Sequence, residues 1–543
     1  MIEICRTAIA DALADLGLDP APIQLDRTKQ LSFGDLATNA PLVYAKQAGM
    51  APMDLAQEIK DRLDLDPKFI ASVALASPGF INFTLADDFL RDQLPAIIKG
   101  GPDYGKSTIG AGQRALVEFV SANPTGPLTV GHGRGAILGD TVSNILQWNG
   151  YQVEREYYYN DAGRQMRLLG ASVQARYQAL LGRDVQFPED GYQGDYIRDI
   201  AQQLLDQRGD ALGDESDTQP FTAAAEQAIF QDIDGTLKEL GIVFDTYFNE
   251  HQLYESGALE NIISALREKD LAYQKDNATW LRGTRLGRDD DRVLIKSTGE
   301  PTYRLPDIAY HADKLQRGYD LLVDIFGADH QDTYPDVLAG LKGLGLDTSR
   351  IRVLIHQFVT LTQAGKQVKM STRKATFVTL DELMALVGRD VVRYFFIMRG
   401  MDTHLRFDLE LARKTSDENP VYYLQYAHAR MFNIKQHAEA LDHHIDPEKA
   451  MLELLDLPEE RLLMHLLWWF PEVVKQVHAS LEPQTVANFL QELATAYHRY
   501  YTVARVVTDD LPLTAARLVL TEACRQTLAN GLAILGISAP ERM

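Results

Sequence analysis

A strand, a glycine-rich turn, a helix and a second strand follow one another in this chain, and this order constrains its fold more than any other feature. The first apolar run spans 114–120, the helix is expected from about Gly131 to Trp148, and the second strand runs from Tyr151 to Tyr159. Parallel strands need a long connection such as a helix, whereas antiparallel strands can be joined by a tight turn. The segment therefore predicts a parallel α/β sheet of the kind that binds nucleotides.

Glycines and turn residues mark off the region before this unit. A loop-rich stretch at 100–112 separates the two. Ahead of it, helices are expected at 2–17 and 54–64, and two strands around a turn at 69–86. This mixture predicts a small α+β domain at 1–105.

The end of the chain has a different character, because no glycine occurs between Gly400 and Gly531. Asn419-Pro420 is typical of a helix start, and apolar residues then recur at spacings of three and four. Further helical runs follow at about 448–479, 483–507 and 513–530. The pattern predicts an all-α helical bundle at 389–543.

The middle domain, expected at 106–388, is interrupted. Residues 160–290 are long and mostly helical in pattern, and strand signals return at 293–297, 321–326 and 351–359. We interpret 160–290 largely as an insertion into the nucleotide-binding sheet.

Composition excludes several classes of protein. The chain has 54 basic and 76 acidic side chains in 543 residues, a formal charge of −22, which argues against indiscriminate nucleic-acid binding but not against a local basic face. Cys5 and Cys524 are too few and too far apart for a disulfide framework or a four-ligand zinc site, so no metal or structural zinc is expected. The sequence has neither a leader pattern nor an unbroken apolar span, so a cytoplasmic location without membrane contact is expected.

The turn after the first strand has the chemistry of a phosphate site. Its glycines let the backbone approach a ligand, and the helix that follows offers free N–H groups and the positive end of its dipole. His132, in the first turn of that helix, can donate to a phosphate oxygen. On its own, a Gly-His pair is more often a turn with a capping histidine, so further motifs must decide.

Two motifs together resemble one family. The stretch 117–140 resembles the signature region of class I aminoacyl-tRNA synthetases, specifically of the arginyl-tRNA synthetase family, whose HIGH-type motif matches 129–132. The segment 369–373 resembles that family's KMSKS loop, about 240 residues downstream. The matched first motif comprises Ala122, Asn123, Pro124, Thr125, Gly126, Pro127, Leu128, Thr129, Val130, Gly131 and His132.

The resemblance extends over nearly the whole chain. Residues 34–39 and 78–83 are similar to the N-terminal domain of the family, which implies contact with the tRNA elbow. Residues 390–395 and 419–430 are similar to its helical anticodon-binding domain, and 539–543 to its ending. The implied architecture is a class I Rossmann-like catalytic domain with a helical insertion, a small N-terminal α+β domain and a C-terminal helical bundle.

The resemblance also implies roles for individual residues. Catalytic roles fall on His132, Lys369, Thr129 and Arg373. Nucleotide contacts fall on Gly131, His132, Gly135, Gly327, Asp329, Lys369, Met370 and Ser371. Contacts to arginine fall on Glu118, Asn123, Tyr303, Asp307 and Gln331. The carboxylates suit this last assignment, because a guanidinium presents a planar fork of donors that pairs with carboxylates in a bidentate manner.

Two positions depart from the family pattern. Thr129 replaces the usual first histidine, which makes one expected phosphate contact shorter and uncharged. Thr372 stands where the second lysine of KMSKS is usual, and Arg373 or Lys374 is the candidate to supply its charge.

The resemblance implies a monomeric arginine–tRNA ligase that uses ATP with Mg²⁺, L-arginine and tRNA(Arg). Arginine would be activated as an adenylate and passed to the 3′ end of the tRNA without a protein nucleophile, and tyrosines at 422–426 would meet anticodon bases. Three rivals stay open: a cysteinyl-tRNA synthetase, a small-molecule nucleotidyltransferase of the same fold, and a catalytically inactive relative that retains tRNA affinity.

Overall fold

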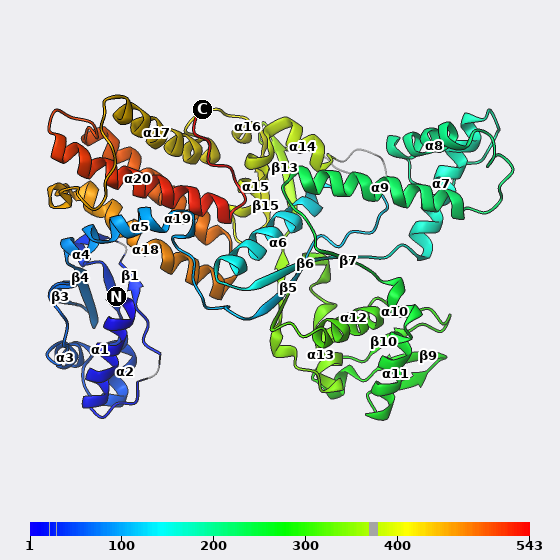
Figure 1. The fold of residues 1–543 in the computed structure, drawn as a ribbon. Coiled ribbons are helices and arrows are strands. Elements are labelled where there is room, and N and C mark those ends of the chain that lie inside the picture. Colours follow the sequence, from blue (N-terminus) through cyan, green and yellow to red (C-terminus); the bar gives the residue numbers. More distant parts are fainter. Residues whose placement is uncertain (21, 29, 369–377) are drawn as a thin grey trace.

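The computed structural model describes residues 1–20, 22–28, 30–368 and 378–543. Its N-terminal unit, blue in Figure 1, pairs four antiparallel strands in the order β1-β2-β4-β3. The strands are β1 (Asp26–Arg27), β2 (Leu36–Thr38), β3 (Ile70–Ala76) and β4 (Phe80–Leu85), accompanied by α1 (Ile2–Asp15), α2 (Ala40–Ala48) and α3 (Pro52–Lys60). The two expected helices and the strand pair within 69–86 are confirmed, and so is the α+β character of this unit.

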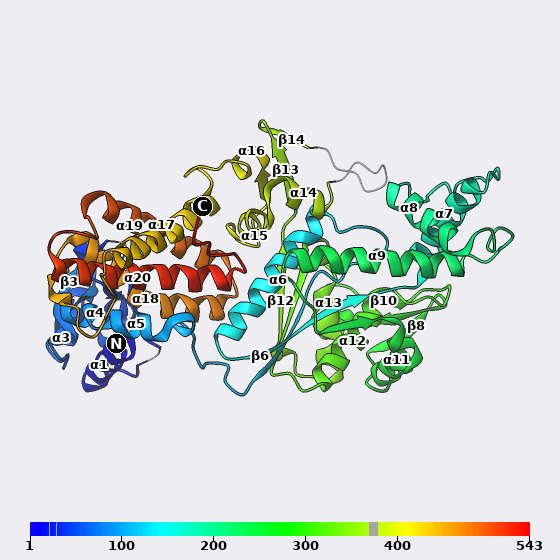
Figure 2. The ribbon, with the colours of Figure 1, turned by 45° about the horizontal axis from the view of Figure 1, so that its top comes forward.

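Two short helices, α4 (Asp87–Arg91) and α5 (Gln93–Gly100), lead out of this unit, and α5 packs along the C-terminal helix α20 (Leu511–Ile534). An ion-pair network also joins the N-terminal unit to the C-terminal helices. Arg461 donates to both carboxylate oxygens of buried Asp35, at 3.0 and 2.8 Å, and to Asp87 at 2.8 Å. The first and last parts of the chain therefore lie side by side (Figures 1 and 2).

The central sheet is fully parallel, as expected, with the order β12-β11-β5-β6-β7. Its strands are β5 (Arg114–Glu118), β6 (Gln152–Tyr159), β7 (Thr246–Asn249), β11 (Leu321–Gly327) and β12 (Ile351–His356). The chain starts in the middle, builds outward through β6 and β7, and then returns to the other side of β5. Ligands of such sheets bind where the order reverses, here beyond the carboxyl ends of β5 and β11.

The position of β7 corrects part of the expected insertion. Residues 160–290 are not one helical insertion, because β7 is the third strand of the central sheet. The helical part before it consists of α7 (Gly163–Leu180), α8 (Asp195–Arg208) and α9 (Gln219–Glu239), which project to one side in Figure 1.

A second excursion follows β7. It contains α10 (His251–Glu255), α11 (Ala258–Glu268) and a separate antiparallel sheet of β8 (Ala272–Lys275), β9 (Ala278–Leu281) and β10 (Arg292–Ile295). The strand expected at 293–297 therefore exists as β10 but belongs to this small sheet, not to the central one. The helices α12 (Arg304–Gln316) and α13 (Tyr334–Leu344) then flank β11 along the chain.

A third small sheet connects the region of the central sheet to the helical bundle. It consists of β13 (Val359–Gln363), β14 (Lys366–Gln367) and β15 (Leu405–Asp408), with α14 (Leu380–Val387), α15 (Arg389–Ile397) and α16 (Leu409–Ala412) around it. The bundle itself is formed by α17 (Pro420–Ala440), α18 (Pro458–Ser480), α19 (Gln484–Val503) and α20. Asn419 caps α17 as the sequence predicts, because its side chain accepts from the Val421 N–H at 3.0 Å.

One long helix, α6 (Val130–Trp148), lies between the central sheet and the C-terminal helices, and two fully buried arginines hold it. Arg134 of α6 donates to the carbonyls of Gln357, Gly400 and Thr403 at 2.6 to 3.0 Å. Arg393 of α15 donates to Asp140 of α6 and to the carbonyls of Leu240 and Leu535. Among the described helices, none is long and apolar enough to cross a membrane.

Candidate active site

The amino end of α6 is built as a capping box. The Thr129 hydroxyl accepts from the His132 N–H at 3.5 Å, and His132 Nδ1 accepts from the Thr129 N–H at 3.2 Å. Because Nδ1 acts as an acceptor, a neutral His132 carries its proton on Nε2. The backbone N–H of Thr129 thus sets the ring of His132 so that Nε2–H is free to donate, and this bond does not depend on the side chain at position 129.

The surroundings keep His132 neutral. Desolvation lowers the pKa of His132 below its ordinary value, and the negative charge of Asp329 opposes this. His132 nevertheless remains open to solvent, as does Gly131 beside it. A neutral, exposed N–H donor at the positive end of a long helix is suited to a phosphate oxygen.

Gly135, expected to contact nucleotide, lies inside the protein. A side chain there would meet Nε2 of His356 at 3.0 Å, so the glycine allows α6 to pack closely against the end of β12. Burial lowers the pKa of His356 to about 4, which keeps this second imidazole neutral as well. Gly135 therefore serves the packing of α6 below the site.

The carboxyl end of β11 supplies the other side of the candidate site. Gly327 ends that strand, and a short turn of helix at Ala328–His330 follows it. Asp329 is exposed and close enough to influence the pKa of both His132 and His356. The structure thus brings Asp329 and His132 together where the strand order reverses, as the sequence predicts for a ligand site.

The turn after β5 is conformationally strained and held by side chains. Val120 and Ser121 have φ angles of 67° and 43°, which are uncommon for residues other than glycine. The Asn123 side chain accepts from the Asn160 N–H at 3.0 Å and donates to Gln165 at 3.2 Å. Strain of this kind is typical of positions at which a chain approaches a ligand.

Glu118 lies behind this turn in a buried ionic network. Only 3% of its surface is exposed, and it accepts from the Ser121 hydroxyl at 2.9 Å and from Lys314. Lys314 also donates to Asp324 at 2.6 Å, and Asp324 contacts His311 at 3.0 Å. Although Glu118, His311 and Asp324 are spaced like metal ligands, the Lys314 ammonium already supplies a positive charge to both carboxylates.

A second group of acidic residues faces the space beside that network. Desolvation raises the pKa of Asp307 to about 7; the charges of Glu118 and Glu250 act in the same direction, while those of His311 and Lys314 oppose them. Glu250 is 7% exposed and accepts from Tyr158 at 2.6 Å and from Tyr254 at 3.2 Å. A carboxyl group with so high a pKa is a candidate functional group, because it lacks a full counter-charge.

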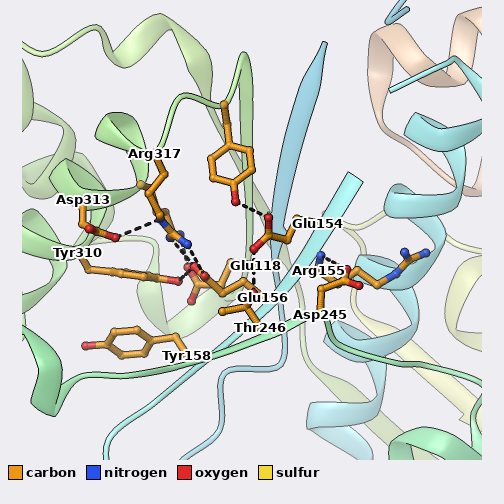
Figure 3. Close-up of polar contacts among 12 residues, drawn as sticks. Glu118, Glu154, Arg155, Glu156, Tyr158, Asp245, Thr246, Tyr310, Asp313 and Arg317 are labelled. Carbon is orange, nitrogen blue, oxygen red and sulfur yellow. Dashed lines mark hydrogen bonds and ion pairs between the residues drawn. The ribbon is translucent and has the colours of Figure 1, made fainter. Parts of the chain in front are cut away.

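The base of this acidic group is fixed to the sheet (Figure 3). Tyr310 donates to Glu156 of β6 at 2.6 Å, and Arg317 pairs with the same carboxylate through two bonds of 2.6 and 2.7 Å. Tyr310 lies on α12, the helix that carries Asp307, and Arg317 directly follows the last residue of that helix. These contacts hold α12 on the sheet and aim its first turn at the candidate site.

The remaining predicted residues lie around this edge. Tyr303 stands directly before α12 and is 81% exposed, and Gln331 is exposed after the turn that contains Asp329. The interactions found among the described residues do not join Gln331 to Asp307. The predicted residues Lys369, Met370, Ser371, Thr372, Arg373 and Lys374 lie outside the described part of the chain.

The residues of this site that were missed from the sequence include Glu250 and Tyr158. Glu250 directly follows β7, just as Glu118 ends β5, so a strand assignment at 246–249 would have pointed to it. Tyr158 lies in the predicted strand at 151–159, among three consecutive tyrosines that periodicity alone cannot tell apart.

A cavity of about 750 Å³ lies in the helical bundle between α17 and the end of α19. Arg430 lies over the rings of Tyr426 and Tyr501, each at 4.6 Å, and Tyr422 stacks on Tyr426. Tyr426 and Tyr501 are 37% and 41% exposed, so these aromatic side chains are not simply core residues. Exposed aromatic and guanidinium planes of this kind can stack on unpaired bases.

Comparison with known proteins covers almost the whole chain. Family models match at 3–85 (arginyl tRNA synthetase N terminal domain), 93–390 (tRNA synthetases class I (R), catalytic domain) and 424–543 (DALR anticodon binding domain). The chain is 50% identical to an arginine–tRNA ligase of Desulfotalea psychrophila, over 94% of this chain and 93% of the relative, and 48% identical to one of Salinibacter ruber over the full length of both. A solved Campylobacter jejuni structure described as an arginyl tRNA synthetase aligns with a TM-score of 0.78 at 31% identity, over 84% of this chain and 100% of that one.

Proposed function

The chain belongs to the arginyl-tRNA synthetase family, and on this premise we propose how its residues carry out arginine–tRNA ligation. The enzyme joins arginine to tRNA(Arg) at the expense of ATP, releasing AMP and pyrophosphate. The assignment of roles depends on one observation: two chemically different groups of residues lie at the same edge of the central sheet. One is a neutral donor at a helix amino end, and the other is a group of carboxylates short of positive charge.

The acidic group is the arginine pocket. A guanidinium has planar N–H donors and a permanent charge, so it complements Asp307 and Glu250 in geometry and sign. Tyr158 and Tyr254 orient the Glu250 carboxylate by donating to it. Asn123, Tyr303 and Gln331, which surround the same edge, would contact the rest of the amino acid. Glu118 is nearly enclosed and acts chiefly as the negative charge behind Asp307.

The amino end of α6 is the phosphate site. The arginine carboxylate attacks the α-phosphate in line, and the chain contributes positioning and charge stabilisation, without a covalent intermediate on the protein. His132 donates from Nε2 to a phosphate oxygen, and Thr129 fixes the ring that does so. Lys369 and Arg373 would add positive charge from the second motif, with Met370 and Ser371 beside them.

Mg²⁺ would enter with ATP. Such ions are usually held by one or two carboxylates together with the phosphates, and the exposed carboxylate of Asp329 beside His132 fits this requirement. The ion would neutralise charge on the phosphates. We propose no structural zinc.

The cavity in the bundle is the proposed anticodon site. Tyr426, Arg430 and Tyr501 form a ladder of planar groups on which unstacked anticodon bases can lie. The acceptor end would then reach the sheet edge, while the N-terminal unit meets the elbow of the tRNA. A monomer in the cytoplasm, with the domain limits 1–105, 106–388 and 389–543, completes the proposal.

Aminoacylation of total tRNA tests this function. The enzyme should charge tRNA with radiolabelled arginine in the presence of ATP, and lysine or cysteine in place of arginine should give no product. Charging of cysteine would support the cysteinyl rival. Binding of tRNA without charging of any amino acid would identify an inactive relative, and adenylate formation without tRNA binding would favour a small-molecule nucleotidyltransferase.

A further inference from the structure

One buried carboxylate, not discussed so far, accepts hydrogen bonds from three arginines. Asp336, in the first turn of α13, is fully enclosed, and it accepts from Nε of Arg288 at 2.9 Å, of Arg292 at 3.3 Å and of Arg304 at 2.9 Å. The arginine side chains are 30, 32 and 24% exposed. One negative charge thus holds three positive ones at short range, and the arginines lower the pKa of Asp336 below its ordinary value.

The three arginines come from different parts of the fold. Arg288 lies in the loop before β10, Arg292 is the first residue of β10, and Arg304 is the first residue of α12. Asp336 therefore joins the small antiparallel sheet, α12 and α13, which lie together in Figure 1. Asp290 pairs with Arg292 at 3.3 Å, and Asp291 turns toward Thr284 and Tyr273, so neither replaces Asp336 at the junction.

This junction stands between two segments of the proposed arginine pocket. Arg304 directly follows Tyr303 and lies one helical turn before Asp307. On the other side, Asp336 lies on the helix that begins three residues after Gln331. The bond between Arg304 and Asp336 therefore fixes the amino end of α12 relative to the chain that carries Gln331.

We propose that Asp336 is a positioning residue for arginine recognition, acting through Arg304 on Tyr303 and Asp307. This inference rests on the proposed function. Removing the charge of Asp336 leaves three guanidinium groups facing one another, and their repulsion displaces the first turn of α12. Since a displacement of about 1 Å can cost up to 10²-fold, arginine binding suffers even though Asp336 does not touch the substrate.

The test compares three variants of the full-length enzyme by steady-state kinetics and by arginine binding in calorimetry. Asp336→Asn should raise the arginine KM and Kd at least tenfold, while the ATP and tRNA KM values change less than threefold. Arg304→Met, which cuts the link to α12 alone, should show the same pattern. Arg288→Met removes a bond of the same length, 2.9 Å, to the other carboxylate oxygen of Asp336, from the loop before β10 and not from α12, and should leave the arginine KM within threefold.

The outcomes separate a positioning role from a structural one. If the junction only stabilises the fold, Arg304→Met and Arg288→Met will lower the melting temperature and leave the arginine KM unchanged, and the proposal is overturned. If Asp336→Asn does not fold, Arg304→Met alone decides. A wild-type enzyme that fails to charge arginine would instead remove the proposed function, a result that the parent protein reveals before any variant is made.

Discussion

Replacing Asp307 by asparagine should weaken arginine recognition while leaving the fold intact or more stable. The change keeps the shape of the side chain and removes the charge that is proposed to face the guanidinium. Losing one partner of a desolvated charge pair typically costs about 2–5 kcal/mol, so the arginine KM should rise by a factor on the order of 30 or more. The KM values for ATP and tRNA should change little, because their groups bind elsewhere on the sheet edge or on the bundle.

The same variant, although it binds arginine more weakly, should be more stable than the parent protein near neutral pH. The pKa of Asp307 is raised from its ordinary value of 3.8 to about 7 in the folded protein. Between these two pH values the carboxyl group takes up a proton on folding, so its stabilising effect is complete below pH 3.8 and is lost as the pH rises through 7. Above pH 7 the ionised group lowers the free energy of unfolding by at most roughly 4 kcal/mol. The actual cost is smaller, because the half-buried carboxylate keeps part of its hydration.

Thermal unfolding without arginine, measured at pH 5 and pH 8, checks this reasoning. Asp307→Asn should be at least as stable as the parent, and its advantage should grow from pH 5 to pH 8. Asp347→Asn is the control, because hydrogen bonds from Ser349 lower the pKa of Asp347 below its ordinary value, so the effect of this change on stability should be the same at pH 5 and pH 8. An unchanged arginine KM in folded Asp307→Asn, or a loss of stability that grows with pH, would refute the assignment of Asp307 to an under-compensated arginine pocket.

Three further predictions follow from the same geometry. Arginine binding should release close to one proton from Asp307 at pH 6 and none at pH 9, because the guanidinium binds the ionised carboxylate; calorimetry in buffers of different ionisation enthalpy measures this number. His132→Ala should lower kcat by about 10²-fold or more, as expected for a lost donor to transition-state charge, whereas Thr129→His should leave kcat within about tenfold. Equal and negligible effects of both changes in pre-steady-state charging would show that the phosphate site lies elsewhere. Arg430→Met should raise the tRNA KM but not the arginine KM, and tRNA affinity should fall steeply between about 50 and 200 mM salt in both enzymes, less so in the variant; a flat salt response would contradict binding through phosphates.

The sequence predicted elements well where the local pattern was strong. The helix expected from Gly131 is observed as Val130–Trp148, and the apolar run at 114–120 contains the central strand of the sheet, Arg114–Glu118. β7 was missed because it has only four residues, Thr246–Asn249, and stands between the long helix α9 and the short helix α10. Its place in the sheet comes from pairing with β6, and a contact over so long a sequence separation leaves little periodicity to read.

The candidate site shows the same division. Chain order and the parallel sheet pointed to the edge where His132 and Asp329 meet, whereas Asp307 was assigned by resemblance alone, and its role stays a prediction. The motifs could not show that Glu118 pairs with Lys314, which lies 196 residues away. Nor could they show that Thr129 orients His132, because that role depends on the hydrogen bonds of a capping box. The positions of residues 369–374 relative to this edge stay a prediction.

The two buried arginines around α6 bear on how this enzyme can diverge. Within the described part of the chain, six groups accept from Arg134 and Arg393, and five of them are backbone carbonyls, at Gln357, Gly400, Thr403, Leu240 and Leu535. A carbonyl is present whatever the side chain, so substitutions at those five positions leave the bonds intact as long as the chain keeps its path. Only Asp140 must retain its chemistry. A hybrid that takes its C-terminal helices from a remote homologue should therefore still hold α6 in place, provided that the graft preserves loop lengths. An insertion of a single residue near 535 would disturb these bonds more than many side-chain replacements.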